Sequence, residues 1–180
     1  MRKLSESVWG DIRKKSLGQE ERREDDFGNI KELKPVNIGG QVLWADKDFE
    51  LKDGTYLFDI GFAKEFGVVN GWRIPTLEES KVFNNSNNQI SRYSNDDEFI
   101  VDDGRKGECI CFKKRGSLDH NGVLIDENEY YAWTIDFKYA QAFGFYTDVT
   151  IKMPVVKYKF RIHMNKHDNQ YCIRLVRDKK

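Results

Sequence analysis

From about Pro35 to the end of the chain, apolar residues occur in short runs that glycine, asparagine and aspartate interrupt. Short runs between turn-forming residues are typical of strands. Strands and helices do not alternate in a sustained way, which argues against a doubly wound parallel sheet. The later runs that we expect to be strands are 109–112, 130–135, 141–146, 155–160 and 171–176. The pattern predicts a small mixed α+β domain with short strands, one or two helices and long loops.

The first part of this region predicts a hairpin and a helix. Residues 36–44 place apolar side chains on both sides of the Gly39–Gly40 pair, as expected for two strands joined by a turn. The run 56–60 then leads into a short helix that contains Phe62 and other apolar residues. Residues 84–107 are rich in asparagine, aspartate and serine, and we expect them to form polar loops.

A second helix start follows Trp72 in the sequence. Pro75 biases Ile74 toward extended geometry, so the helix can begin only after the proline. Thr76 is a suitable N-cap residue, and Glu79 follows it three residues later, which is the spacing of a capping box. We therefore expect a helix from residue 77 that stops in the asparagine-rich stretch after Phe83.

The charge balance limits the partners of the chain. Its 180 residues include 30 Lys and Arg and 30 Asp and Glu, so the formal net charge is zero. A general nucleic-acid binder normally carries a clustered basic excess, and we expect no nucleic-acid partner. No apolar run approaches the roughly 20 residues that span a bilayer, and we expect neither a secretory signal nor membrane insertion. Three cysteines are an odd number for a disulfide framework, which favours reduced thiols.

The composition changes near residue 28, which divides the chain into an extended N-terminal arm, 1–28, and a domain, 29–180. In the arm, Leu4, Val8 and Ile12 would share one stripe of a short helix. A segment this short does not fold alone. It is either a loosely attached leader or a docking peptide that becomes ordered on a partner protein. Trp9 favours docking, because a large aromatic side chain is a typical anchor at protein interfaces.

No motif demands a metal, a cofactor or catalysis. Cys109 and Cys111 would lie on one face of a strand, but zinc sites usually need wider spacings and a second pair of ligands. We expect these cysteines to pack as small apolar side chains. His163 and His167 have the spacing of a helical chelate, yet the sequence around them is typical of an exposed turn. We therefore predict a protein that is not an enzyme and holds no metal or cofactor.

Three sequence blocks, taken in order, resemble the Fibrobacter-type major paralogous domain, which has a C-type-lectin-like fold. They are the Val-x-Ile-Gly-Gly block followed by a tryptophan, the Gly-Trp-Arg-Ile-Pro-Thr-x-x-Glu block, and the Tyr-Tyr-Ala-Trp-Thr block with the Cys-Ile-Arg-Leu-Val-Arg-Asp end. The residues that carry the resemblance are Trp44, Trp72, Arg73, Pro75, Thr76, Glu79, Trp133, Arg174 and Arg177. The signatures of calcium-dependent sugar binding are missing from the sequence.

We expect the three arginines of these blocks, Arg73, Arg174 and Arg177, to bind carboxylates inside the domain rather than a ligand. The tryptophans and the alternating residues of 172–176 should furnish a mixed core.

The arm resembles leaders on virion proteins of tailed phages of gut Bacteroidetes, including crAss-like phages. That resemblance implies a non-enzymatic virion structural protein, such as a head fibre, a capsid decoration protein or a tail-associated adhesion component, assembled in the host cytoplasm. Leu4, Val8, Trp9 and Ile12 would dock to another virion protein of the capsid or tail. The domain would project outward, with a host surface glycan or protein as its partner. A homo-oligomer would add avidity to weak contacts.

Two other interpretations remain open. A bacterial surface or secreted lectin-like binding module would bind a glycan through the isolated domain, but it calls for a transport signal. An oxidase of the formylglycine-generating type shares the lectin-like fold, but it needs a suitable pair of reactive cysteines. The spacing of Cys109 and Cys111 gives that chemistry little support.

Overall fold

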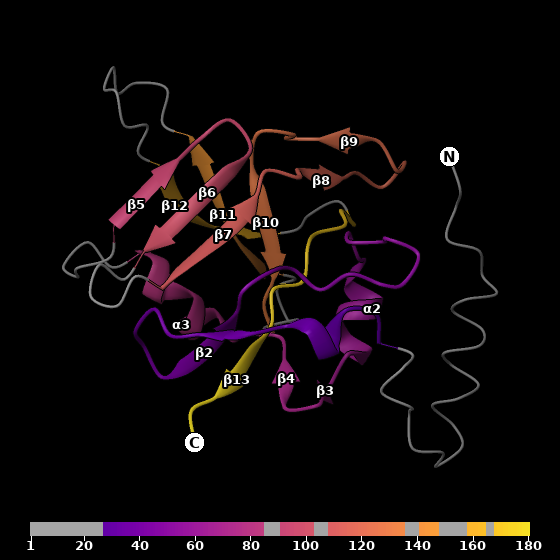
Figure 1. The fold of residues 1–180 in the computed structure, drawn as a ribbon. Helices are drawn as coiled ribbons and strands as arrows, with labels where there is room; N and C mark the ends of the chain where they lie inside the picture. Colours follow the sequence, from indigo (N-terminus) through magenta and orange to yellow (C-terminus); the bar gives the residue numbers. More distant parts are fainter. Residues whose placement is uncertain (1–26, 85–90, 103–107, 136–140, 148–157, 165–167) are drawn as a thin grey trace, which may run out of the picture.

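The computed structural model describes residues 27–84, 91–102, 108–135, 141–147, 158–164 and 168–180, and most of the strands among them are antiparallel (Figure 1). Together they form a small mixed domain with two short helices, α2 (Ile60–Glu65) and α3 (Leu77–Ser80). Two 3-10 turns, η2 (Ile30–Glu32) and η3 (Lys81–Asn84), add to them. Within this part of the chain, no helix is both long enough and apolar enough to cross a membrane.

A five-stranded sheet joins the two ends of the described domain. Its strand order is β1-β2-β13-β4-β3. The strands are β1 (Pro35–Val36), β2 (Val42–Ala45), β13 (Val176–Asp178), β4 (Trp72–Arg73) and β3 (Val68–Val69). Val176 pairs with Trp44 on one side and with Arg73 on the other. The predicted hairpin around Gly39–Gly40 is confirmed, since β1 and β2 pair antiparallel.

The remaining strands form smaller antiparallel sheets between β4 and β13 in the sequence. One contains β10 (Tyr130–Trp133), β11 (Gln141–Thr147) and β12 (Tyr158–Met164), and another contains β5 (Ser91–Ser94), β6 (Glu98–Asp102) and β7 (Cys109–Lys113). The two-stranded hairpin consists of β8 (Ser117–Leu118) and β9 (Leu124–Ile125). This hairpin lies at the opposite end of the domain from β13 and the C-terminus (Figure 1).

The chain from Tyr171 to Val176 separates two apolar cores. Tyr171, Ile173 and Leu175 belong to a first core, which also contains Trp72 and Trp133. Residues 172 and 176 belong to a second core, which is rich in phenylalanine and contains Trp44. The predicted alternation is therefore present, but both sets of side chains are buried. The reason is that each face of this segment meets a core of its own.

Both predicted helix starts are confirmed. At α3, the Thr76 hydroxyl accepts a hydrogen bond from the Glu79 backbone N–H, and the Glu79 carboxylate accepts one from the Thr76 N–H, which completes the capping box. At α2, the Asp59 carboxylate accepts from the Phe62 N–H over 2.8 Å. Phe62 turns its ring onto Phe58, with 4.5 Å between the ring centroids.

Two predictions for extended and loop regions are wrong in part. Residues 84–107 are not loop throughout, because β5 and β6 lie within them and β6 buries Phe99 and Val101. The C-terminal strand begins only at Val176, and the chain from Tyr171 makes isolated bridges instead. These bridges join it to segments of both cores, so a regular ladder does not form. The strand expected at 155–160 begins at Tyr158 and runs on to Met164; residues 155–157 lie outside the described part.

Candidate functional site

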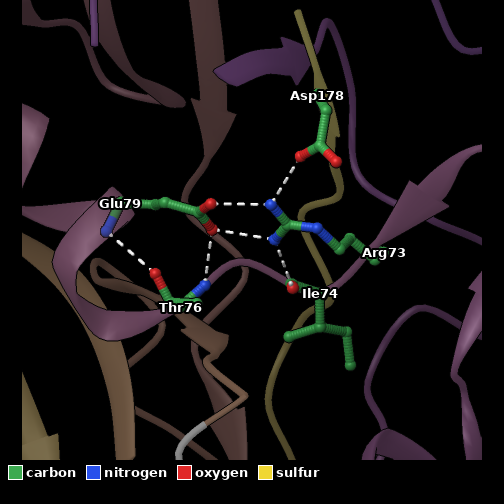
Figure 2. Close-up of polar contacts among 5 residues, drawn as sticks. All are labelled: Arg73, Ile74, Thr76, Glu79 and Asp178. Atoms are coloured by element: carbon green, nitrogen blue, oxygen red, sulfur yellow. Dashed lines mark hydrogen bonds and ion pairs between the residues drawn. The ribbon is translucent and has the colours of Figure 1, made fainter. Parts of the chain in front are cut away.

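Arg73 on β4 is the centre of a network that connects three elements (Figure 2). Its guanidinium donates to both carboxylate oxygens of Glu79, over 2.9 and 2.7 Å, and to Asp178 Oδ1 over 2.8 Å. The Arg73 side chain also lies 3.4 Å from the carbonyl oxygen of Ile74. Planar, two-point pairing of this kind fixes the orientation of both partners. The network therefore fastens α3 and β13 to β4.

The same contacts set the charge of Glu79. Burial would raise its pKa, but hydrogen bonds from Arg73 and from the Thr76 N–H together outweigh burial and leave the pKa below its usual value. The hydrogen bond with Glu79 raises the pKa of Arg73. Both groups are therefore charged at neutral pH, and the prediction that Arg73 binds a carboxylate within the domain is confirmed.

Arg174 forms a second internal ion pair, in the middle of the domain. Its Nε donates to Asp48 Oδ1 over 2.8 Å, and Tyr130 Oη donates to the same oxygen over 2.7 Å. The other guanidinium nitrogens donate to the carbonyl oxygens of Ala45 and Cys111. The side chains of Arg174 and Asp48 are only 1% and 2% exposed, so this pair is structural. The internal carboxylate predicted for Arg174 is confirmed.

Arg177 differs from the prediction. Its guanidinium lies over the ring of Trp72, 5.4 Å from the centroid, and no carboxylate pairs with it among the described residues. The neighbouring Asp178 carboxylate goes to Arg73 instead. In a strand, successive side chains point to opposite faces, which separates Arg177 from the network around Arg73.

The other signature residues are also structural. Trp44, Trp72 and Trp133 are buried, and Trp133 Nε1 donates to the carbonyl oxygen of Phe58 over 2.7 Å. Pro75 is buried, and its carbonyl oxygen accepts from the Ile135 N–H. The structure thus brings the signature residues into the two cores and their ion pairs, which gives them a role in folding.

The predicted docking residues Leu4, Val8, Trp9 and Ile12 lie outside the described residues. Among the described residues, no three His, Cys, Asp or Glu side chains are grouped as a metal would need.

The cysteines follow the expected packing only in part. Cys109 is exposed and Cys111 is half-buried on the outer face of β7, whereas Cys172 is buried. The prediction that the β7 pair packs in the core is wrong for Cys109, since Ile110 and Phe112 occupy the inward positions of that strand. Burial raises the pKa of Cys111 to about 11, which keeps its thiol protonated at neutral pH.

The sequence did not single out a third polar cluster, which we call the Arg161 site: Arg161, Glu129, Tyr131, Tyr146 and His163. Arg161 lies on β12, where it pairs in register with Gly144 of β11, and Gly144 pairs with Tyr131 of β10. The Arg161 guanidinium lies 5.1 Å from the ring centroid of Tyr131 and 4.9 Å from that of Tyr146. Glu129 accepts hydrogen bonds from Arg161 and from the Tyr131 hydroxyl.

Burial raises the pKa of titratable groups at the Arg161 site and beside it. It raises the pKa of Glu129, although Arg161 opposes the shift. Burial also raises the pKa of Tyr171, which packs against Tyr131 and His163, to about 12. The one sequence signal for the site was the alternation of Lys159, Arg161 and His163, which places three basic side chains on one face of a strand.

Comparison with known proteins finds no matching family model, no matching curated protein and no matching solved structure. The function is therefore inferred from the residues and their geometry.

Proposed function

We propose that the protein is a non-enzymatic virion structural protein of a tailed phage. It is a head fibre, a decoration protein or a tail-associated adhesion component. Residues 1–28 dock to another virion protein, and residues 29–180 form a C-type-lectin-like domain that faces outward.

The observation that supports this proposal best is the pairing of β2 with β13. These strands come from the two ends of the described domain, and they are neighbours in one sheet. Most of the intervening chain forms the other sheets, and the β8–β9 hairpin lies at the far end (Figure 1). A domain whose first and last parts are neighbours in one sheet, with the other sheets built from the chain between them, suits display on a particle. The confirmed capping box after Trp72 further supports the lectin-like interpretation.

Docking would draw its affinity from apolar burial. Leu4, Val8, Trp9 and Ile12 account for most of the large apolar side chains in a largely polar segment. Each contributes roughly 1.5–3 kcal/mol when it is fully buried, before the cost of ordering the arm is subtracted.

Deleting residues 1–26 tests the proposal. We expect the truncated protein to keep its near-ultraviolet circular dichroism and its melting temperature, and to be lost from purified particles of the encoding phage. A matched pair of full-length variants separates apolar docking from a length effect. Leu4, Val8 and Ile12 are changed to serine in one, and Glu6, Asp11 and Lys14 in the other. Only the first should fail to enter particles; normal incorporation of the truncated, folded protein would refute the docking role.

A bacterial surface or secreted lectin-like binding module is the second candidate. The Arg161 site supports this candidate as well as the first, because charged and aromatic side chains meet there at the surface of a sheet. This candidate predicts strong binding to a single sugar on a glycan array and no need for the arm. The two candidates therefore differ in whether removal of residues 1–26 changes localisation.

A further inference from the structure

The protein holds the Arg161 guanidinium in position but does not provide hydrogen-bond partners for all of its N–H groups. Its side chain is 38% exposed, and its NH2 group pairs with Glu129. The Nε atom is buried and has no hydrogen-bond partner among the described residues. The NH1 group makes no hydrogen bond to them either. Buried donors of this kind are rare in folded proteins and call for an explanation.

A glycine on the central strand lets the Arg161 guanidinium and the Tyr131 ring approach each other. Gly144 lies between Tyr131 and Arg161 in the register, and a Cβ atom there would come within 2.5 Å of the Tyr131 ring. The missing side chain lets Arg161 reach across the central strand to the Tyr131 ring. Tyr146, two residues further along β11, supports the guanidinium from a second direction. A guanidinium oriented in this way loses little conformational entropy when it binds an anion.

Charged groups of both signs surround Arg161: Lys159 on β12, and the carboxylates of Glu129 and Asp126. Lys159, Arg161 and His163 lie on the same face of this strand, and Lys159 is exposed. Glu129 is the carboxylate in contact with Arg161. Its contacts with Arg161 and with the Tyr131 hydroxyl both use Oε2, which leaves Oε1 to accept from a ligand hydroxyl.

We propose that the Arg161 site binds a sugar that carries a carboxylate. The NH1 group and the second N–H of the NH2 group would take the carboxylate, because planar guanidinium and carboxylate groups match in geometry; the buried Nε does not face the ligand. Glu129 would accept from sugar hydroxyls, and the half-exposed ring of Tyr146 would border the sugar ring. The inference deepens the proposed function, since it names the class of host glycan that the displayed domain recognises.

The test is a nuclear magnetic resonance titration of the full chain with methyl glucuronide. Its uncharged methyl ester and acetate serve as comparison ligands. We expect saturable shifts of the Arg161 and Tyr146 signals with the glucuronide, and at least about tenfold weaker binding of the ester and of acetate. Arg161→Lys keeps the charge but loses the planar fork, and it should weaken glucuronide binding by about tenfold or more. Arg177→Lys makes the same change at an arginine that also stacks on an aromatic ring, and it should leave binding unchanged.

Each other outcome overturns the inference. Equal binding of the ester and the glucuronide would show that the site does not recognise the carboxylate. Equal binding of acetate and the glucuronide would show that the site does not recognise the sugar. Normal glucuronide binding by a folded Arg161→Lys variant would show that Arg161 does not form the binding site. The absence of saturable shifts in the folded wild-type chain would show that the chain does not bind the sugar. Incorporation into particles does not depend on any of these results. Failure of the sugar site is therefore distinguishable from failure of the virion proposal.

Discussion

At the scale of single residues, the two ion pairs differ mainly in their exposure to water. Arg174 and Asp48 are almost fully buried, whereas Asp178 at the edge of the Arg73 network has an 81% exposed side chain. Water screens an exposed pair, but a buried charge that loses its partner has no solvent to replace it. Burial would lower the pKa of Arg174, but Asp48 and Tyr130 more than offset this effect and raise it.

Asp48→Asn should therefore be strongly destabilising. The substitution leaves the Arg174 charge buried without a counter-ion, at a cost of about 3 kcal/mol or more. Urea denaturation at neutral pH measures the loss. Asp178→Asn removes a carboxylate from the exposed end of the other network and should cost less than about 1 kcal/mol. Similar losses in the two variants would contradict the structural role given to the buried pair.

The Arg73 network predicts a pH dependence with a definite sign. The pKa of Glu79 in the folded protein lies below its ordinary value of 4.5, so folding favours the charged form. The resulting stability is fully present above pH 4.5 and is lost as the pH falls through the lowered pKa. The free energy of unfolding of wild type should exceed that of Glu79→Gln at neutral pH, and the difference should shrink on acidification. A difference in unfolding free energy between the two proteins that stays constant from pH 7 to pH 3 would contradict the lowered pKa of Glu79.

At the scale of elements, the sequence predicts local features correctly but not the long-range pairing of strands. The capping box at Thr76 and the turn at Gly39–Gly40 involve residues close in sequence, so their patterns are visible there. Strand β6 alternates half-buried and buried residues, but it lies in a polar stretch and needs β7 to bury Phe99. Whether such a segment forms a strand depends on pairing with distant parts of the chain. The sequence therefore predicted a loop here.

Gly144→Ala tests how closely the strands pack at the Arg161 site. The new Cβ atom would lie 2.6 Å from the Tyr130 carbonyl oxygen, which belongs to the backbone and cannot rotate away. We expect a loss of about 1–3 kcal/mol in the free energy of unfolding, as for other overpacked positions. Gly61→Ala in α2 meets only the Asp59 side chain, at 3.2 Å, and should change stability by less than about 1 kcal/mol. A Gly144→Ala variant as stable as wild type would contradict this packing.

At the scale of the whole molecule, the sequence predicted the α+β class but not the division into two cores. The sequence predicts one strand over residues 171–176, whereas the structure places this segment between two apolar clusters. The Arg161 site was missed for a related reason. Its members come from β10, β11, β12 and the residue before β10, and only the register of the three strands brings Tyr131, Gly144 and Arg161 into one row. Sequence spacing alone holds no information about that row.

Under the proposed function, the arm docks to the particle and the domain is displayed on it. The most direct measurement is therefore to fuse residues 1–28 to an unrelated fluorescent protein and count the copies carried by purified particles of the encoding phage. We predict that this fusion enters particles, and that the same fusion with serine at positions 4, 8 and 12 does not. A fusion that stays out of particles, while the domain without its arm is incorporated, would contradict the account.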